Sequence, residues 1–101
     1  MSELPSYENF AGQMNTKFSL LDSPQPFELE LVELTAPTVT ASQTYFSLYF
    51  LGGKEFMLPQ GTYRMRHEKL GEMLLFLVPI SPEGDGFRYE SVFNLLNEPA
   101  V

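Results

Sequence analysis

From residue 16 onward, apolar and polar residues alternate with a period of two along most of the chain, which predicts β-strands. The alternation is clearest in residues 27–31, 43–51, 62–68 and 87–95, and Pro-, Gly- and Asp-containing turn sequences separate these segments. The central and C-terminal connections are too short for the crossovers that parallel strands need. The sheet is therefore predicted to be mainly antiparallel.

The longest apolar run, residues 73–80, shows no such alternation. Successive side chains of a strand point to opposite faces, so we expect neither face of this strand to meet solvent. One face would lie on the core. The other would be covered by a packed loop, a helix, a second sheet or another subunit.

Two local features break the pattern. Pro79 cannot donate a hydrogen bond to a ladder, so it should lie at the strand end, at a bulge or on an edge. Val32 is apolar where the alternation predicts a polar residue, and a β-bulge near residues 32–33 would restore the inward face. The alternative is a strand whose second half is covered on its other side as well.

Residues 5–14 are predicted to form one short helical segment, in which Tyr7, Phe10 and Met14 lie on one stripe. Such a stripe would cover an open edge or the mouth of a barrel, with Ser6 as the helix cap. Residues 16–96 would then form the β unit of a single domain over 1–101. We predict an all-β fold, mainly antiparallel: a small β-barrel or two-layer β-roll of about six strands with a short N-terminal helix.

Composition narrows the classes of function. The chain has no cysteine, which excludes disulfides, thiolate metal sites and a cysteine nucleophile. Its net charge of −7 makes nucleic acid and anionic membrane surfaces improbable partners. No apolar run approaches the ~18 residues of a membrane span, and the N-terminus lacks the features of a signal peptide. A cytoplasmic protein is the expectation.

The side chains that could act in catalysis or bind a metal are better explained by structural or solvent-facing roles. His67 is the only histidine, so a site with several histidines within one subunit is impossible, and a structural or surface role is favoured. Glu28 and Glu30 share the outer face of one strand, where solvation is the simpler role. We therefore predict no catalytic residue, no cofactor and no metal site, and a protein that is not an enzyme.

The candidate interaction surface is the second face of the long apolar strand together with outward tyrosines. If neighbouring strands bring these side chains together, they form an apolar patch with a tyrosyl rim, which is typical of an interaction surface. The alternative is that the N-terminal helix and the loop of residues 35–42 cover it. The predicted surface residues are Tyr45, Tyr49, Met73, Leu75 and Leu77.

Four segments carry a resemblance to a known family: residues 46–50, 59–63, 75–80 and 89–94. Together they resemble a small, mostly bacterial all-β family that carries a domain-of-unknown-function label. The resemblance implies a self-contained β domain without an assigned activity. It also implies an accessory or assembly role beside a phage-tail-like structure.

The predicted function is a non-enzymatic interaction or structural module that self-associates or binds a protein partner. The alternative is a barrel that binds a small apolar ligand. Phenylalanine rings would line such a barrel, although about six strands leave little room inside. These residues are Phe18, Phe27, Phe46, Phe76 and Phe93.

Overall fold

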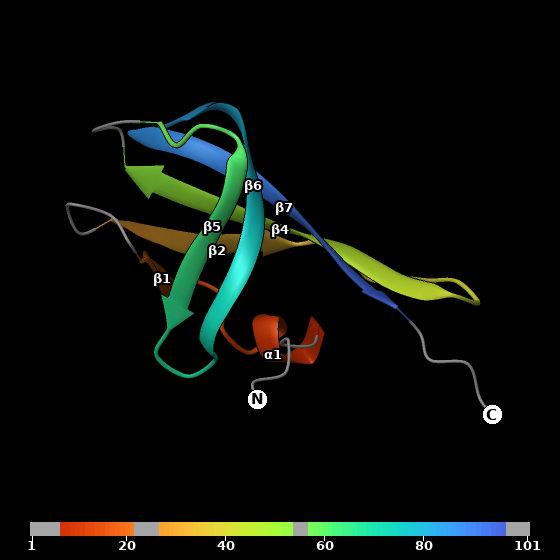
Figure 1. Ribbon diagram of the computed structural model, residues 1–101. Coiled ribbons are helices and arrows are strands. Elements are labelled where there is room, and N and C mark those ends of the chain that lie inside the picture. Colours follow the sequence, from red (N-terminus) through yellow and green to blue (C-terminus); the bar gives the residue numbers. More distant parts are fainter. Residues whose placement is uncertain (1–6, 22–26, 54–56, 97–101) are drawn as a thin grey trace.

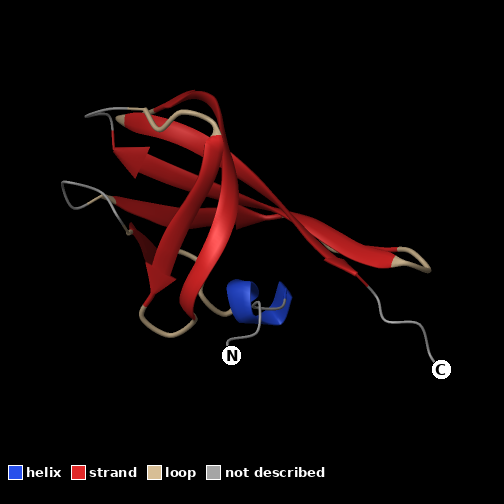
Figure 2. Ribbon diagram, viewed as in Figure 1, coloured by secondary structure: helices blue, strands red, loops and turns tan. Residues whose placement is uncertain are grey.

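The computed structural model describes residues 7–21, 27–53 and 57–96 of the chain. The predicted cap Ser6 and the turn predicted at residues 22–26 lie outside these ranges. One short helix precedes the strands, as Figure 2 shows. The elements are α1 (Tyr7–Ala11), β1 (Lys17–Leu20), β2 (Glu28–Leu34), β3 (Thr38–Val39), β4 (Gln43–Gly53), β5 (Gly61–His67), β6 (Gly71–Glu83) and β7 (Gly86–Leu96).

Six of the strands close into a barrel in the order β1-β5-β6-β7-β4-β2, and β2 pairs with β1 to complete the ring (Figure 1). Every pairing between neighbouring strands is antiparallel. The short strand β3 pairs with β4. The predicted mainly antiparallel barrel with a short N-terminal helix is therefore confirmed.

The barrel interior is filled by aromatic and aliphatic side chains from the alternating strands. On β4, Phe46, Leu48 and Phe50 are buried as the alternation predicts. The Phe46 ring stacks on Phe93 of β7 at 5.4 Å, and the Phe18 ring of β1 meets Phe50 edge-on at 5.2 Å. Because these rings pack against one another, the phenylalanines fill the core rather than line an open cavity.

Both predicted breaks in the alternation are bulges. The β2–β4 register shifts between Leu31 and Glu33, which leaves Val32 as the extra residue. The β6–β7 register shifts between Pro79 and Ser81, so Pro79 lies beside an irregularity where a ladder donor is not required. The bulge in β2 brings Leu34 back against the core, as predicted.

Helix α1 covers one end of the barrel, below β6 in the view of Figure 1. Phe10 is completely buried, with its ring 5.1 Å from Phe93 and 6.1 Å from Phe46. Tyr7 and Met14 are partly buried against the same core. The predicted stripe and its role at the barrel mouth are thus confirmed.

The prediction that neither face of residues 73–80 meets solvent is wrong. The odd-numbered side chains from Met73 to Leu77 are buried, whereas Leu74, Phe76 and Ile80 are 61%, 46% and 48% exposed. The outer face stays open because α1 lies at the barrel mouth. The segment 35–42, the other predicted cover, runs away from the barrel in Figure 1.

That segment belongs to a projection that we call the arm, made of residues 35–45 with the end of β7, residues 94–96. Thr38 and Val39 pair with Tyr45 and Thr44, and the start of β4 pairs with the end of β7. The sequence predicts a loop over residues 35–42. The structure shows instead a narrow ribbon that extends beyond the barrel (Figure 1).

Candidate interaction surface

Strand β6 changes its partner half-way along its length. Its first half pairs with β5 from His67↔Gly71 to Gly61↔Leu77. Its second half pairs with β7, and that ladder ends at Val78↔Glu90. Beyond this pair β6 and β7 separate, because β7 continues along β4 while β6 continues along β5.

A groove of about 330 Å³ lies where the two strands separate. We call it the β6–β7 groove. Strands whose ladder has ended present backbone N–H and C=O groups along the free edge, and such edges are templates for a further strand. The groove is lined by Thr62, Leu74, Leu75, Phe76, Ser91, Val92, Phe93 and Asn94.

The rim of the groove is apolar and uncharged. Leu74 and Phe76 of β6 and Val92 of β7 point outward, and Val92 is 58% exposed. None of the eight lining residues is ionisable, although 19% of the chain is charged. Clustered exposed apolar side chains beside free strand edges are typical of a protein-interaction site.

The structure places three of the predicted surface residues in the core, and the exposed side chains of β6 lie on its other face. Met73, Leu75 and Leu77 are 5%, 2% and 0% exposed, so these three predicted surface residues belong to the core. The geometry of a strand divides these side chains into two sets, but a uniformly apolar run does not say which set points inward. The pairing Met65↔Met73 decides this, because Met65 of β5 is itself buried.

The two predicted tyrosines lie on the outer face of β4 and do not line the groove, although Tyr45 pairs with Asn94, which does. Tyr45 is on the arm and 37% exposed. Tyr49 donates a hydrogen bond from its hydroxyl to Glu90 Oε2 at 3.0 Å, and the Arg88 guanidinium lies over its ring at 4.6 Å. The hydrogen bond to Glu90 raises the pKa of Tyr49. Arg88 also pairs with Glu33, so Tyr49 belongs to a polar cluster rather than an apolar patch.

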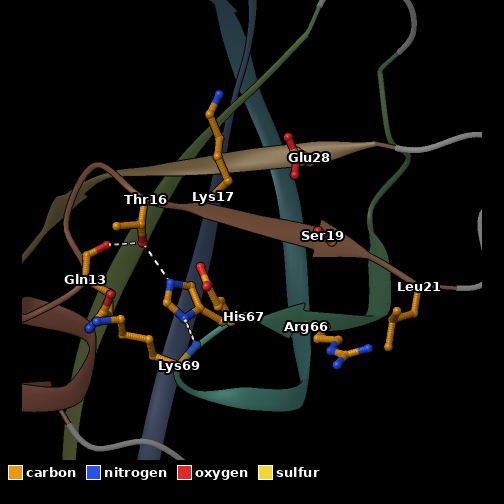
Figure 3. Close-up of a pocket in the computed structure, with 10 residues that line it drawn as sticks. Gln13, Thr16, Lys17, Ser19, Leu21, Glu28, Arg66, His67 and Lys69 are labelled. Atoms are coloured by element: carbon orange, nitrogen blue, oxygen red, sulfur yellow. Dashed lines mark hydrogen bonds between the residues drawn. The ribbon is translucent and has the colours of Figure 1, made fainter.

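A second hollow, of about 630 Å³, lies beside His67 (Figure 3). Thr16 Oγ1 donates to the Gln13 carbonyl oxygen at 2.6 Å, so its oxygen accepts the proton of His67 Nε2 at 2.8 Å. His67 Nδ1 accepts the backbone N–H groups of Lys69 at 2.9 Å and of Leu70 at 3.2 Å. Both ring nitrogens are therefore engaged, and the ring is the neutral Nε2–H tautomer.

This geometry assigns His67 a structural role, as the sequence favours. The side chain is 3% exposed, and burial lowers its pKa. It joins the connection between α1 and β1 to the β5–β6 turn, whose Gly71 has a left-handed φ of 81°. Within residues 7–21, 27–53 and 57–96, no three or more His, Cys, Asp or Glu side chains are grouped to hold a metal ion.

No helix in the part of the chain that the structure describes has the length and apolar character needed to cross a bilayer.

Comparisons with known proteins return one match. Neither the curated proteins nor the solved structures include a match to this chain. A family model described as a domain of unknown function, DUF6916, matches residues 5–93, which takes in α1 and every barrel strand except the end of β7. Since that match covers most of the sequence, the chain belongs to the DUF6916 family.

Proposed function

We propose that this protein is a non-enzymatic assembly module that self-associates through the β6–β7 groove. The observation that carries the proposal is the coincidence of two free strand edges with the exposed side chains of Leu74, Phe76 and Val92. Burying these side chains against a second protein surface would contribute roughly 1.5–3 kcal/mol for each one fully removed from water. We expect these side chains to form the centre of the contact, because a few residues usually carry most of the binding energy of an interface.

The hydrogen bonds of His67 and the packing of the core rings favour this function over the two alternatives, an enzyme and a ligand carrier. An enzyme needs a general acid, base or nucleophile with a free functional atom, and both nitrogens of His67 are already hydrogen-bonded. A ligand carrier needs interior space, and the rings of Phe10, Phe46 and Phe93 pack together there. Phe76, one of the five predicted lining residues, lies on the outside of the barrel.

On the family resemblance alone, we extend the proposal to an accessory role in a bacterial, phage-tail-like assembly in the cytoplasm. This part is tested in the native host. A pull-down with the wild-type chain should recover tail-like structural proteins, and the Phe76→Asp variant should not. Recovery of only unrelated enzymes would contradict this part of the proposal.

The proposed self-association is tested by sedimentation velocity over a series of concentrations. The wild type should sediment faster as its concentration rises, and Phe76→Asp should remain at the monomer value because a carboxylate replaces the exposed ring on the groove rim. Ile80→Asp is the matched control, since Ile80 is equally exposed on the same strand but does not line the groove. It should associate like the wild type.

A wild type that stays monomeric up to about 1 mM, where association worth roughly 4 kcal/mol is half complete, would contradict the proposal. Equal loss of association in Ile80→Asp and Phe76→Asp would also contradict it. Leu75→Asp is unsuitable for this experiment, because it places a carboxylate in the core and destabilises the barrel.

A further inference from the structure

We infer that the β6–β7 groove of one copy receives the arm of a second copy, so that the copies join head to tail. The inference rests on the proposed function and goes beyond it by naming the occupant of the groove. It is carried by three independent features of the arm: its exposure, its lack of charge and its continuous strand pairing with the barrel.

The arm is exposed along most of its length. Every side chain from residue 36 to residue 42 is exposed, and Val39 is 69% exposed. Strand β3 pairs with β4 on one side and with no other described strand, so its outer edge is free. A strand that has a free edge and an exposed β-branched residue can pair with a strand of another chain.

The arm matches the groove in charge. No Asp, Glu, Lys, Arg or His occurs between Glu33 and Lys54, in a chain whose net charge is −7. The residues that line the groove are uncharged as well. Most surfaces of two acidic copies repel each other, whereas these two surfaces can meet without removing an ionised group from water.

The arm cannot fold back into the groove of its own copy. The β4–β7 ladder runs without a register shift from Gln43↔Leu96 on the arm to Gly53↔Gly86 in the barrel. The same strand β7 thus lines the groove with residues 91–94 and continues into the arm with residues 94–96. Because this ladder holds the arm in line with β7, we expect the arm to reach the groove of a second copy rather than its own.

The inserted segment is short. Pro37 has no N–H group to add to a ladder, so the added strand would consist of residues 38–40, with Val39 beside the apolar rim. The free edge of β7 spans the four residues 91–94, about 13 Å at 3.3 Å per residue, which accommodates such a strand. A contact between two different surfaces produces a ring or an open filament.

A mixing experiment tests the head-to-tail contact. Val39→Asp disables the arm and leaves the groove intact, and Phe76→Asp disables the groove and leaves the arm intact. Each variant alone should sediment as a monomer. An equimolar mixture should form a 1:1 dimer and nothing larger, because only one competent arm–groove pair exists in it. Circular dichroism and thermal melting establish that both variants are folded.

The outcomes separate this inference from the proposed function. If Val39→Asp associates like the wild type while Phe76→Asp does not, the groove is a contact surface but the arm is not its occupant, and the inference is overturned. A mixture that stays monomeric also overturns it, since the contact would then be symmetric. A monomeric wild type overturns the proposed function together with the inference.

Discussion

Gly86 lies opposite Gly53 at the end of the β4–β7 ladder, where the two backbones approach closely. A methyl group at position 86 would lie 1.8 Å from the carbonyl oxygen of Gly52. The obstacle is backbone rather than the flexible end of a side chain, so the two strands would have to separate. At this position the absence of a side chain is a packing requirement of the barrel.

Gly86→Ala should therefore destabilise the protein by about 1–3 kcal/mol or more, because the added carbon overpacks two hydrogen-bonded strands. Gly61→Ala is the matched control, since a Cβ there meets its nearest neighbour, the Tyr63 ring, at an ordinary 3.8 Å. Urea denaturation of the two variants measures the difference. Coincident midpoints would show that the approach of the two strands does not constrain position 86.

The stability should also depend on pH through His67, the single histidine of the chain. Burial lowers its pKa in the folded state below the value of about 6.5 expected when unfolded. As the pH falls through 6.5, the unfolded chain takes up a proton before the folded chain does. The free energy of unfolding should therefore decrease from neutral pH toward pH ~5.5 and be unaffected by this group above pH ~7.5.

The variant His67→Asn identifies the group responsible, because its amide oxygen can still accept the N–H groups of the turn but does not titrate. Its free energy of unfolding should be nearly constant over the same pH range. Parallel pH profiles of the wild type and the variant would assign the dependence to carboxylates instead.

At the scale of elements, β6 and α1 shape the site together. β6 is long enough to pair with β5 in its first half and with β7 in its second, which opens the groove between them. Behind the groove, Phe10 of α1 packs against Phe93 and closes the barrel mouth. The helix has only five residues, so it depends on this packing for its own stability.

Phe10→Ala should consequently cost about 3–5 kcal/mol of stability, because it leaves a cavity among aromatic rings at the barrel mouth. Glu8→Ala, an exposed position of the same helix, should change stability by no more than about 0.5 kcal/mol. Chemical denaturation compares the two. Equal effects would mean that α1 does not contribute to the core.

The described part of the molecule is a filled barrel that carries an uncharged projection, the arm, and an uncharged hollow, the β6–β7 groove. Its excess of acidic residues favours solubility and makes most surfaces of two copies repel each other. Strand β7 contributes to both uncharged surfaces, because its residues 91–94 line the groove and its residues 94–96 belong to the arm. Such an arrangement suits repeated contacts between copies better than enclosure of a small ligand.

We expect no thermal stabilisation by apolar ligands. A panel of fatty acids and aromatic compounds should leave the melting temperature unchanged, because the core rings occupy the interior. A melting temperature that rises steadily with the concentration of one compound would reveal binding to the folded state and favour the carrier.

Much of the architecture could be predicted because it follows from local patterns. The period of two located most of the strands and the bulge near Val32, and the missing N–H of Pro79 indicated the irregularity beside it. Helical spacing placed Phe10 against the core. The exposed side chains of β6 were not predicted correctly, because Leu74 and Phe76 form its exposed face whereas Met73 and Leu75 are buried.

Local patterns were enough to predict the class of fold, most of the strand positions and the short helix at the barrel mouth. These depend on side-chain period, turn chemistry and chain length, which act between near neighbours. Three features became clear only in the folded chain: which face of β6 is open, where β6 and β7 separate and that residues 35–45 project as an arm. Those features depend on which distant strands pair and in which register, and a pattern within one segment carries no information about its partners.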